Sequence, residues 1–185
     1  MRAGPRPFYK TIFDTLVFLL ALTLVLGAMK KFGVIDLGGG AYQVVDGDSL
    51  RKGGTDIRLY GIDAPEYQQT CRDRDDRDYN CGKQAAAELR KLVQGPDLRC
   101  SSLETDRYGR AVSICKTENL EINAEMVRKG WAVAYSRHSL DYVKLEAEAR
   151  RAKRGLWEGR FEEPEAYRNR QRVIRGDLGT AIEVD

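Results

Sequence analysis

The chain has 185 residues, of which 42% are apolar and 32% are charged. This composition fits one ordinary globular domain with appendages and excludes a second large domain. The net charge of +3 tolerates a polyanionic partner, but so small an excess of positive charge does not by itself indicate nucleic-acid binding.

The N-terminal segment, residues 1–31, is predicted to be a hydrophobic helix that serves as a membrane anchor or signal segment. Basic residues precede an apolar run over residues 12–29, and Lys30 and Lys31 follow it directly. This order favours an uncleaved signal anchor over a cleaved signal peptide, and a buried core helix is the remaining alternative. The membrane is therefore an expected partner of this helix.

A small β-barrel is predicted to begin after a glycine-rich linker over residues 32–41. Short strands are expected at 42–45, 49–51 and 56–62, separated by glycine-containing turns. The globular domain is predicted to cover residues 42–160.

The rest of this domain is predicted to hold about three helices and a hairpin. Apolar residues recur at helical spacing over 85–93, and two further helices are expected, a short one that ends at Gly130 and a longer one that begins at Ser139. A last short strand is expected at 131–135. Residues 161–185 are predicted to be a polar tail.

The cysteine pattern predicts two disulfides rather than a zinc site, because the chain has a single histidine, His138, and no Cys-x-x-Cys pair. In an antiparallel hairpin centred on the turn from Asp106 to Gly109, Cys100 and Cys115 would face each other. The second pair would close a charged loop. The four residues are Cys71, Cys81, Cys100 and Cys115. Four reduced, buried thiols are the alternative, whereas two disulfides indicate an exported domain.

Three charged motifs follow one another along the chain. They are Asp46-Gly47-Asp48, the segment from Arg58 to Glu66, and Asp106-Arg107-Tyr108-Gly109-Arg110. In this order, and with a helix between the second and the third, they resemble the motifs of the staphylococcal nuclease-like (thermonuclease) family over residues 41–157. The resemblance implies an α+β fold built on an OB-fold five-stranded barrel, and hydrolysis of nucleic acid with calcium.

The resemblance makes Asp48 and Asp63 ligands of Ca²⁺, and carboxylate oxygens are the donors that such a hard cation prefers. Ala64 stands where threonine is frequent in the family and would lend its backbone carbonyl. The preceding Asp46-Gly47 pair is also typical of a simple hairpin turn, which explains those two residues but not Asp48.

Glu66 resembles the family carboxylate that accepts a proton from the attacking water or positions that water. Arg58 and Arg110 resemble the pair that binds the phosphate and offsets its growing negative charge. A surface cluster of salt bridges is the alternative interpretation. Strand alternation would place Arg58 and Asp63 on opposite faces, so the chain must bend between them, and Gly61 is the expected position.

Tyr108 and Tyr135 are candidates for stacking on nucleobases, although both could equally be packing residues. The sequence therefore predicts a nuclease that cleaves DNA and RNA with little sequence preference, and the resemblance implies 3′-phosphate ends. The domain is expected outside the cytoplasm, either membrane-anchored or secreted. A non-catalytic OB-fold module that binds nucleic acid or protein at the cell envelope is the alternative.

Overall fold

The polypeptide divides into two units, residues 1–40 and 41–185. The structure, a computed structural model, describes residues 8–31, 41–95, 97–137 and 139–176. Residues 32–40 of the predicted linker, and His138, lie outside the described residues.

The first unit contains helix α1, Phe8–Lys31. Among the described residues, no helix has the length and apolar character needed to cross a membrane. The predicted membrane anchor thus has no support among the described residues.

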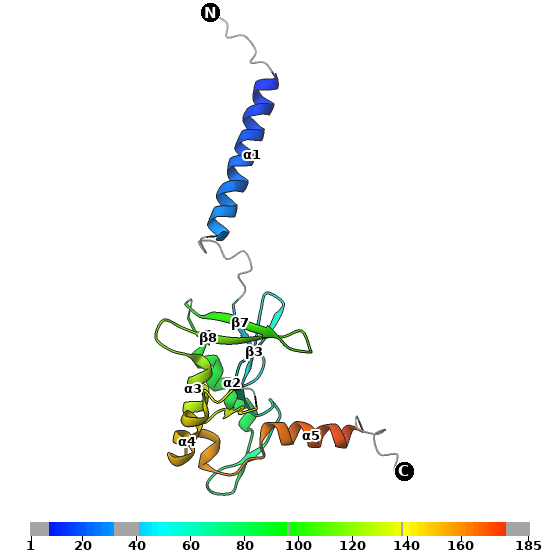
Figure 1. The fold of residues 1–185 in the computed structure, drawn as a ribbon. Helices are drawn as coiled ribbons and strands as arrows, with labels where there is room; N and C mark the ends of the chain where they lie inside the picture. The colour runs from blue at the N-terminus through cyan, green and yellow to red at the C-terminus, as the bar shows by residue number, and fades with distance from the viewer. Residues whose placement is uncertain (1–7, 32–40, 96, 138, 177–185) are drawn as a thin grey trace, which may run out of the picture. The chain divides into compact units, whose positions relative to one another are not determined.

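The second unit is built around a mixed five-stranded sheet (Figure 1). Its strands are β1 (Gln43–Val44), β2 (Ser49–Lys52), β3 (Thr55–Leu59), β7 (Arg99–Thr105) and β8 (Ala111–Lys116). The spatial order is β1-β2-β3-β8-β7, in which β3 and β8 run parallel and the other neighbours are antiparallel. Turns that contain glycine join β1 to β2 and β2 to β3, so the short strands predicted between these turn signals do form.

The predicted five-stranded barrel is not closed. Gly61 has a φ of +72°, and this left-handed turn ends β3 and directs β4 (Ile62–Asp63) away from the main sheet to pair with β9 (Val133–Ala134). A Cβ atom at Gly61 would lie 2.8 Å from the Tyr142 ring, so only glycine fits this bend. In the described part of the chain, β1 and β7 are consequently the open edges of the sheet.

Among its described residues the second unit has four α-helices, one more than predicted, and a short 3₁₀ helix, Gly155–Glu158. The α-helices are α2 (Cys81–Leu92), α3 (Ile122–Arg128), α4 (Val143–Arg151) and α5 (Pro164–Arg175). The predicted polar tail is therefore helical over α5, which extends away from α3 and α4 on the other side of the unit (Figure 1). Proline at the first helical position and Gly176 at the C-terminal cap define its ends.

One apolar core connects the sheet to α2 and α3. Leu50, Leu59 and Ile62 from the strands pack with Leu89 of α2 and Met126 of α3, and all five are at most 1% exposed. A smaller cluster holds the disulfide Cys71–Cys81 against Leu156. The core thus fixes β3 and β4, which carry most of the second charged motif, Arg58 to Glu66.

Both predicted disulfides are present. Cys100 and Cys115 are direct partners across the β7–β8 hairpin, with their Cα atoms 4.0 Å apart. Cys71 and Cys81 join a second small hairpin, formed by β5 (Cys71–Arg72) and β6 (Asp78–Tyr79), to the start of α2.

Candidate active site

The turn between β1 and β2 positions Asp48. The backbone N–H of Asp48 donates to Oδ1 of Asp46 at 3.1 Å, which closes the turn. A Cβ atom at Gly47 would lie 2.7 Å from Cβ of Ala64 and 2.8 Å from Cβ of Ala85. Glycine here therefore lets the turn pack directly on Ala64 of the second motif and on Ala85 of α2, so Asp46-Gly47 does more than form a hairpin turn.

Asp48 is a buried carboxylate with a complete set of donors. It accepts hydrogen bonds from the Ser49 hydroxyl at 2.9 Å and from the backbone N–H of Ala64 at 3.0 Å. Arg58 Nη1 lies 3.2 Å from Oδ1, and Nη2 lies 3.0 Å from Oδ2. Burial opposes the ionised form, but the charge of Arg58 and these hydrogen bonds outweigh it and lower the pKa of Asp48.

Arg58 joins the two aspartates. Its Nη2 atom also lies 2.7 Å from Oδ1 of Asp63, which the bend at Gly61 has turned to the same side. The expected bend is thus confirmed, and strand alternation is interrupted where the site requires it. The Asp63 side chain is only 2% exposed, and this burial, together with the neighbouring Asp48, raises the pKa of Asp63 against the opposing effect of Arg168 and Arg58.

The sequence analysis missed an arginine that the structure places in this cluster. Arg168 of α5 binds Asp63 with both terminal nitrogens, Nη1 to Oδ1 at 2.9 Å and Nη2 to Oδ2 at 2.8 Å. Its Nη1 also donates to Oε1 of Glu66 at 3.1 Å. Burial disfavours the charged form of Arg168, but the hydrogen bonds and negative charges of Asp63 and Glu66 have the larger effect and raise the pKa of Arg168.

Glu66 is held by its backbone and stays partly accessible. The backbone N–H of Glu66 donates to Oε1 of Gln69 at 3.2 Å, and the Gln69 amide donates to the Glu162 carbonyl at 2.7 Å. Gln69 is fully buried, so it connects the Glu66 loop to the segment that leads into α5. The Glu66 side chain is 36% exposed.

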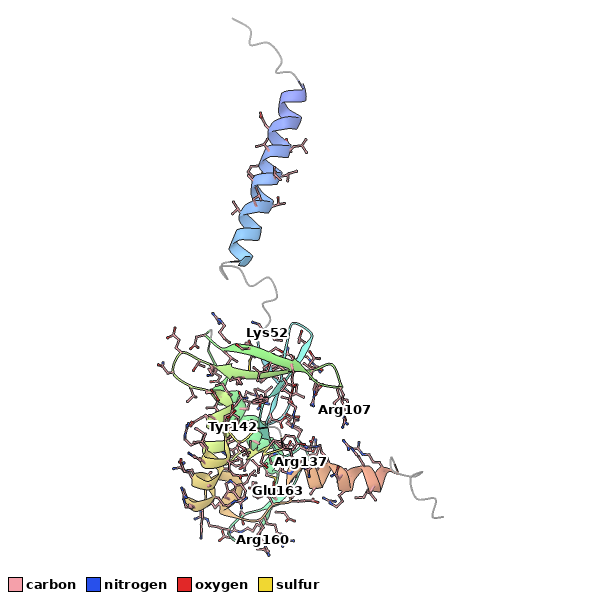
Figure 2. The ribbon with its side chains drawn as sticks, in the orientation of Figure 1. Lys52, Arg107, Arg137, Tyr142, Arg160 and Glu163 are labelled. Atoms are coloured by element: carbon pink, nitrogen blue, oxygen red, sulfur yellow. A yellow bond between two sulfur atoms is a disulfide. The ribbon has the colours of Figure 1, made fainter. Side chains whose placement is uncertain are left out.

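Arg110 enters the site from the β7–β8 turn and is bound to Asp106. Its Nε donates to Oδ2 of Asp106 at 2.7 Å, and its backbone N–H donates to Oδ1 at 2.9 Å. Partial burial favours the neutral form of Asp106. These hydrogen bonds, together with one from the Tyr108 backbone N–H, outweigh that effect and lower the pKa of Asp106. Arg107 lies at the tip of the same turn (Figure 2).

A cavity of about 720 Å³ brings these groups together. Arg58, Glu66 and Arg110 all line it, as do Arg168 and the two predicted stacking residues, Tyr108 and Tyr135. Tyr108 is 63% exposed, with the Arg110 guanidinium 5.5 Å from its ring centre. Five arginines of the described chain line the cavity, among them Arg58, Arg110 and Arg168, together with the accessible carboxylate of Glu66. Such an arrangement can bind a phosphodiester and accept a proton beside it.

The predicted metal ligands meet only in part. Asp48 and Asp63 share Arg58, and Ala64 bonds Asp48 through its N–H, so oxygen donors suited to a hard cation are adjacent. Within the described ranges, however, no three acidic, histidine or cysteine side chains form a group that could hold a metal ion. The donor chemistry fits calcium, but a cation at Asp63 would have to displace hydrogen bonds from Arg168.

Comparisons with known proteins agree with this geometry. A family model described as "Staphylococcal nuclease homologue" matches residues 56–159. An "Uncharacterized endonuclease" of Escherichia coli O157:H7 is 34% identical over 129 residues, which cover 66% of this chain and 78% of that protein. A "Probable staphylococcal-like nuclease CAN2" of Oryza sativa subsp. japonica is 33% identical, over 65% of this chain and 31% of its own length.

A third relative is the "Succinoglycan biosynthesis protein ExoI" of Rhizobium meliloti (strain 1021). It is 31% identical over 121 residues, which cover 64% of this chain and 63% of that protein. The chain thus spans less than two thirds of this relative. The residues matched by the family model include Arg58, Asp63, Glu66 and Arg110, whereas Asp48 and Arg168 lie outside them.

Proposed function

This chain belongs to the staphylococcal nuclease family, and from that premise we propose that it is a calcium-dependent nuclease. Its substrates are DNA and RNA, cleaved with little sequence preference, and the family resemblance favours 3′-phosphate products. The observation that carries the proposal is that Arg58, Glu66 and Arg110, from three separate segments, line one cavity beside two buried aspartates.

In this proposal Arg58 and Arg110 bind the non-bridging oxygens of the scissile phosphate. Their guanidinium groups remain charged at all relevant pH values and stabilise the negative charge that increases during attack. Glu66 accepts the proton of the attacking water, a role that suits the accessible carboxylate of the cluster. Tyr108 and Tyr135 provide ring faces for the adjacent bases.

Calcium is proposed to bind at Asp48, Asp63 and the carbonyl of Ala64. When bound, it would supply positive charge beside the phosphate and orient water. The support is the pair of adjacent buried carboxylates, since hard oxygen donors are the ligands that Ca²⁺ prefers.

A binding module without catalysis is the second candidate. It is favoured by the hydrogen bonds that already occupy Asp48 and Asp63, because Arg58 and Arg168 neutralise these carboxylates without a metal. Retained binding of single-stranded DNA in EDTA, without cleavage in calcium, would support this candidate.

We place the domain outside the cytoplasm. The support is the pair of disulfides, Cys71–Cys81 and Cys100–Cys115, because such bonds persist in oxidising compartments and are rare in the cytosol.

The deciding experiment is cleavage of single-stranded DNA by the oxidised chain in calcium and in EDTA. Arg110→Ala is expected to lower kcat/KM by about 1,000-fold, because one phosphate-binding charge is lost from the transition state. The matched control is Arg90→Ala, which removes an equal charge from the exposed face of α2. Equal rates in both variants would remove Arg110 from the site, and no cleavage by the folded wild type would favour the binding module.

A further inference from the structure

A second hollow adjoins the active-site cavity on the far side of Arg168. It has a volume of about 320 Å³ and lies between the loop that follows β4 and one face of α5. Glu66, Arg168 and Arg172 line both hollows. Because they share these residues, the two hollows are adjacent, and together they are called the track past the proposed catalytic carboxylate.

The α5 side of this track carries a row of arginines. Arg168, Arg172 and Arg175 are spaced by four and three residues, which places them on the same face of the helix, and all three line the second hollow. In the described part of the chain, the ion pairs of α5 are made by Glu165, Arg168 and Arg170. Arg172 and Arg175 are exposed and so present their charge to the hollow and to solvent.

The opposite side of the hollow carries an aromatic ring. Tyr67, directly after Glu66, lines it and is 40% exposed, and the Lys83 amino group lies 6.0 Å from the centre of its ring. Tyr167 of α5 lines the same hollow. Positive charge along a groove, alternating with accessible aromatic faces, is the arrangement with which proteins bind single-stranded nucleic acid without sequence preference.

We propose that this second hollow is a substrate subsite that binds the nucleic-acid strand beyond the scissile phosphate. Arg172 and Arg175 bind backbone phosphates there, and Tyr67 stacks on a base. From Arg168 to Arg175 the helix advances by about 10 Å, so the row of arginines is long enough to contact successive backbone phosphates of an extended strand. The inference rests on the proposed function and narrows the substrate class to extended strands rather than mono- or dinucleotides.

The first test measures binding without catalysis. Affinity of the full chain for a fluorescein-labelled oligothymidylate of about 12 nucleotides is followed by anisotropy in EDTA over a range of salt concentrations. The slope of log K against log salt is negative, and in single strands each lost phosphate contact reduces its magnitude by about 0.7. The double variant Arg172→Ala/Arg175→Ala is expected to reduce the magnitude of this slope by about 1.4.

The matched control removes the same charge from surfaces that line neither hollow. Arg90→Ala/Arg151→Ala changes exposed residues of α2 and α4 and is expected to keep the wild-type slope. Equal slopes in the two double variants would overturn the subsite. If Arg172→Ala/Arg175→Ala lost binding to phosphatidylglycerol vesicles while its DNA binding stayed unchanged, the subsite would also be overturned. The arginines would then be assigned to a lipid surface.

The second test separates the subsite from the nuclease proposal. In calcium, the wild type is expected to cleave oligothymidylates of about 12 nucleotides at higher kcat/KM than those of about 4. Tyr67→Ala should reduce this preference about tenfold, because one stacked base contributes about 1–3 kcal/mol. Cleavage by the wild type with the preference unchanged in Tyr67→Ala and in Arg172→Ala/Arg175→Ala would remove the subsite but leave the nuclease intact.

The same tests also recognise a subsite without a nuclease. If the wild type does not cleave, yet the magnitude of the salt slope is reduced in Arg172→Ala/Arg175→Ala and not in its control, the nuclease proposal fails while the strand-binding track stands.

Discussion

At the scale of single residues, the site is a small array of alternating charges. Asp48, Arg58, Asp63 and Arg168 form a chain of ion pairs in which the two acid side chains are at most 3% exposed. A buried charge that loses its partner is strongly destabilising, so these four side chains have to be considered as one unit. The guanidinium of Arg168 stands beside the same carboxylate that a cation would need.

Arg168→Ala is therefore expected to tighten calcium binding. The substitution removes two hydrogen bonds from Asp63 and one from Glu66, and a single charged hydrogen bond is worth about 1.5 kcal/mol or more. The dissociation constant for Ca²⁺, measured by calorimetry without substrate, should fall about tenfold.

Arg170→Ala provides the comparison, because its guanidinium lies on the same helix but binds Glu162. Weaker or unchanged affinity in Arg168→Ala would show that Arg168 does not compete with the cation.

Asp106 is a positioning residue for Arg110, and Asp106→Asn is expected to lower kcat by up to about a hundredfold, since small displacements of a reacting group are this costly.

The lowered pKa of Asp106 also makes the free energy of unfolding depend on pH. A carboxyl with a depressed pKa stabilises the fold fully above its ordinary value of 3.8 and loses that contribution as the pH falls through the folded-state value.

The free energy of unfolding of wild type and Asp106→Asn should accordingly differ by about 1 kcal/mol at neutral pH. The difference should shrink below pH 3.8, as followed by urea denaturation across pH. A difference that is constant or grows on acidification would contradict the assigned hydrogen bonds.

At the scale of elements, the β7–β8 hairpin carries Arg110 to the cavity and α5 carries Arg168 to it. The hairpin was predictable, because its turn residues and the symmetric placement of Cys100 and Cys115 define it locally. A bulge between Ser102 and Glu104 shifts the register near the turn, and the cysteines still pair. Helix α5 was not predicted, because Pro164 is its one buried residue and its charged and polar residues outnumber its apolar ones.

Removal of the hairpin disulfide with Cys100→Ala/Cys115→Ala is expected to lower the free energy of unfolding by about 3 kcal/mol. The reason is that the bond closes a loop of 15 residues and restricts the unfolded chain. Chemical denaturation of the variant and of the oxidised wild type measures the difference. A loss well below 1 kcal/mol would mean that β7–β8 pairing alone holds the turn.

At the scale of the whole molecule, the fold of the second unit draws on its own residues. Its main core cluster uses side chains between Tyr42 and Leu145, and the chain divides at Gly40. Residues 41–185 alone should therefore keep the melting temperature and the cleavage rate of the full chain. Circular dichroism and a cleavage assay test this. A melting temperature lower by 10 °C or more, which corresponds to roughly 3 kcal/mol, would show that residues 1–40 stabilise the domain.

The sequence by itself determined the features that depend on local chemistry. The turn motifs, the strand pattern, the hairpin disulfide and the bend at Gly61 follow from residues close together in the chain. The resemblance of three short motifs to a family pointed to the five charged positions Asp48, Arg58, Asp63, Glu66 and Arg110. Tertiary structure decided which of these meet. Arg168 reaches Asp63 across 105 residues, and the sheet stays open because Gly61 directs β4 to β9. Such contacts arise from the packing of distant segments, which no local periodicity records.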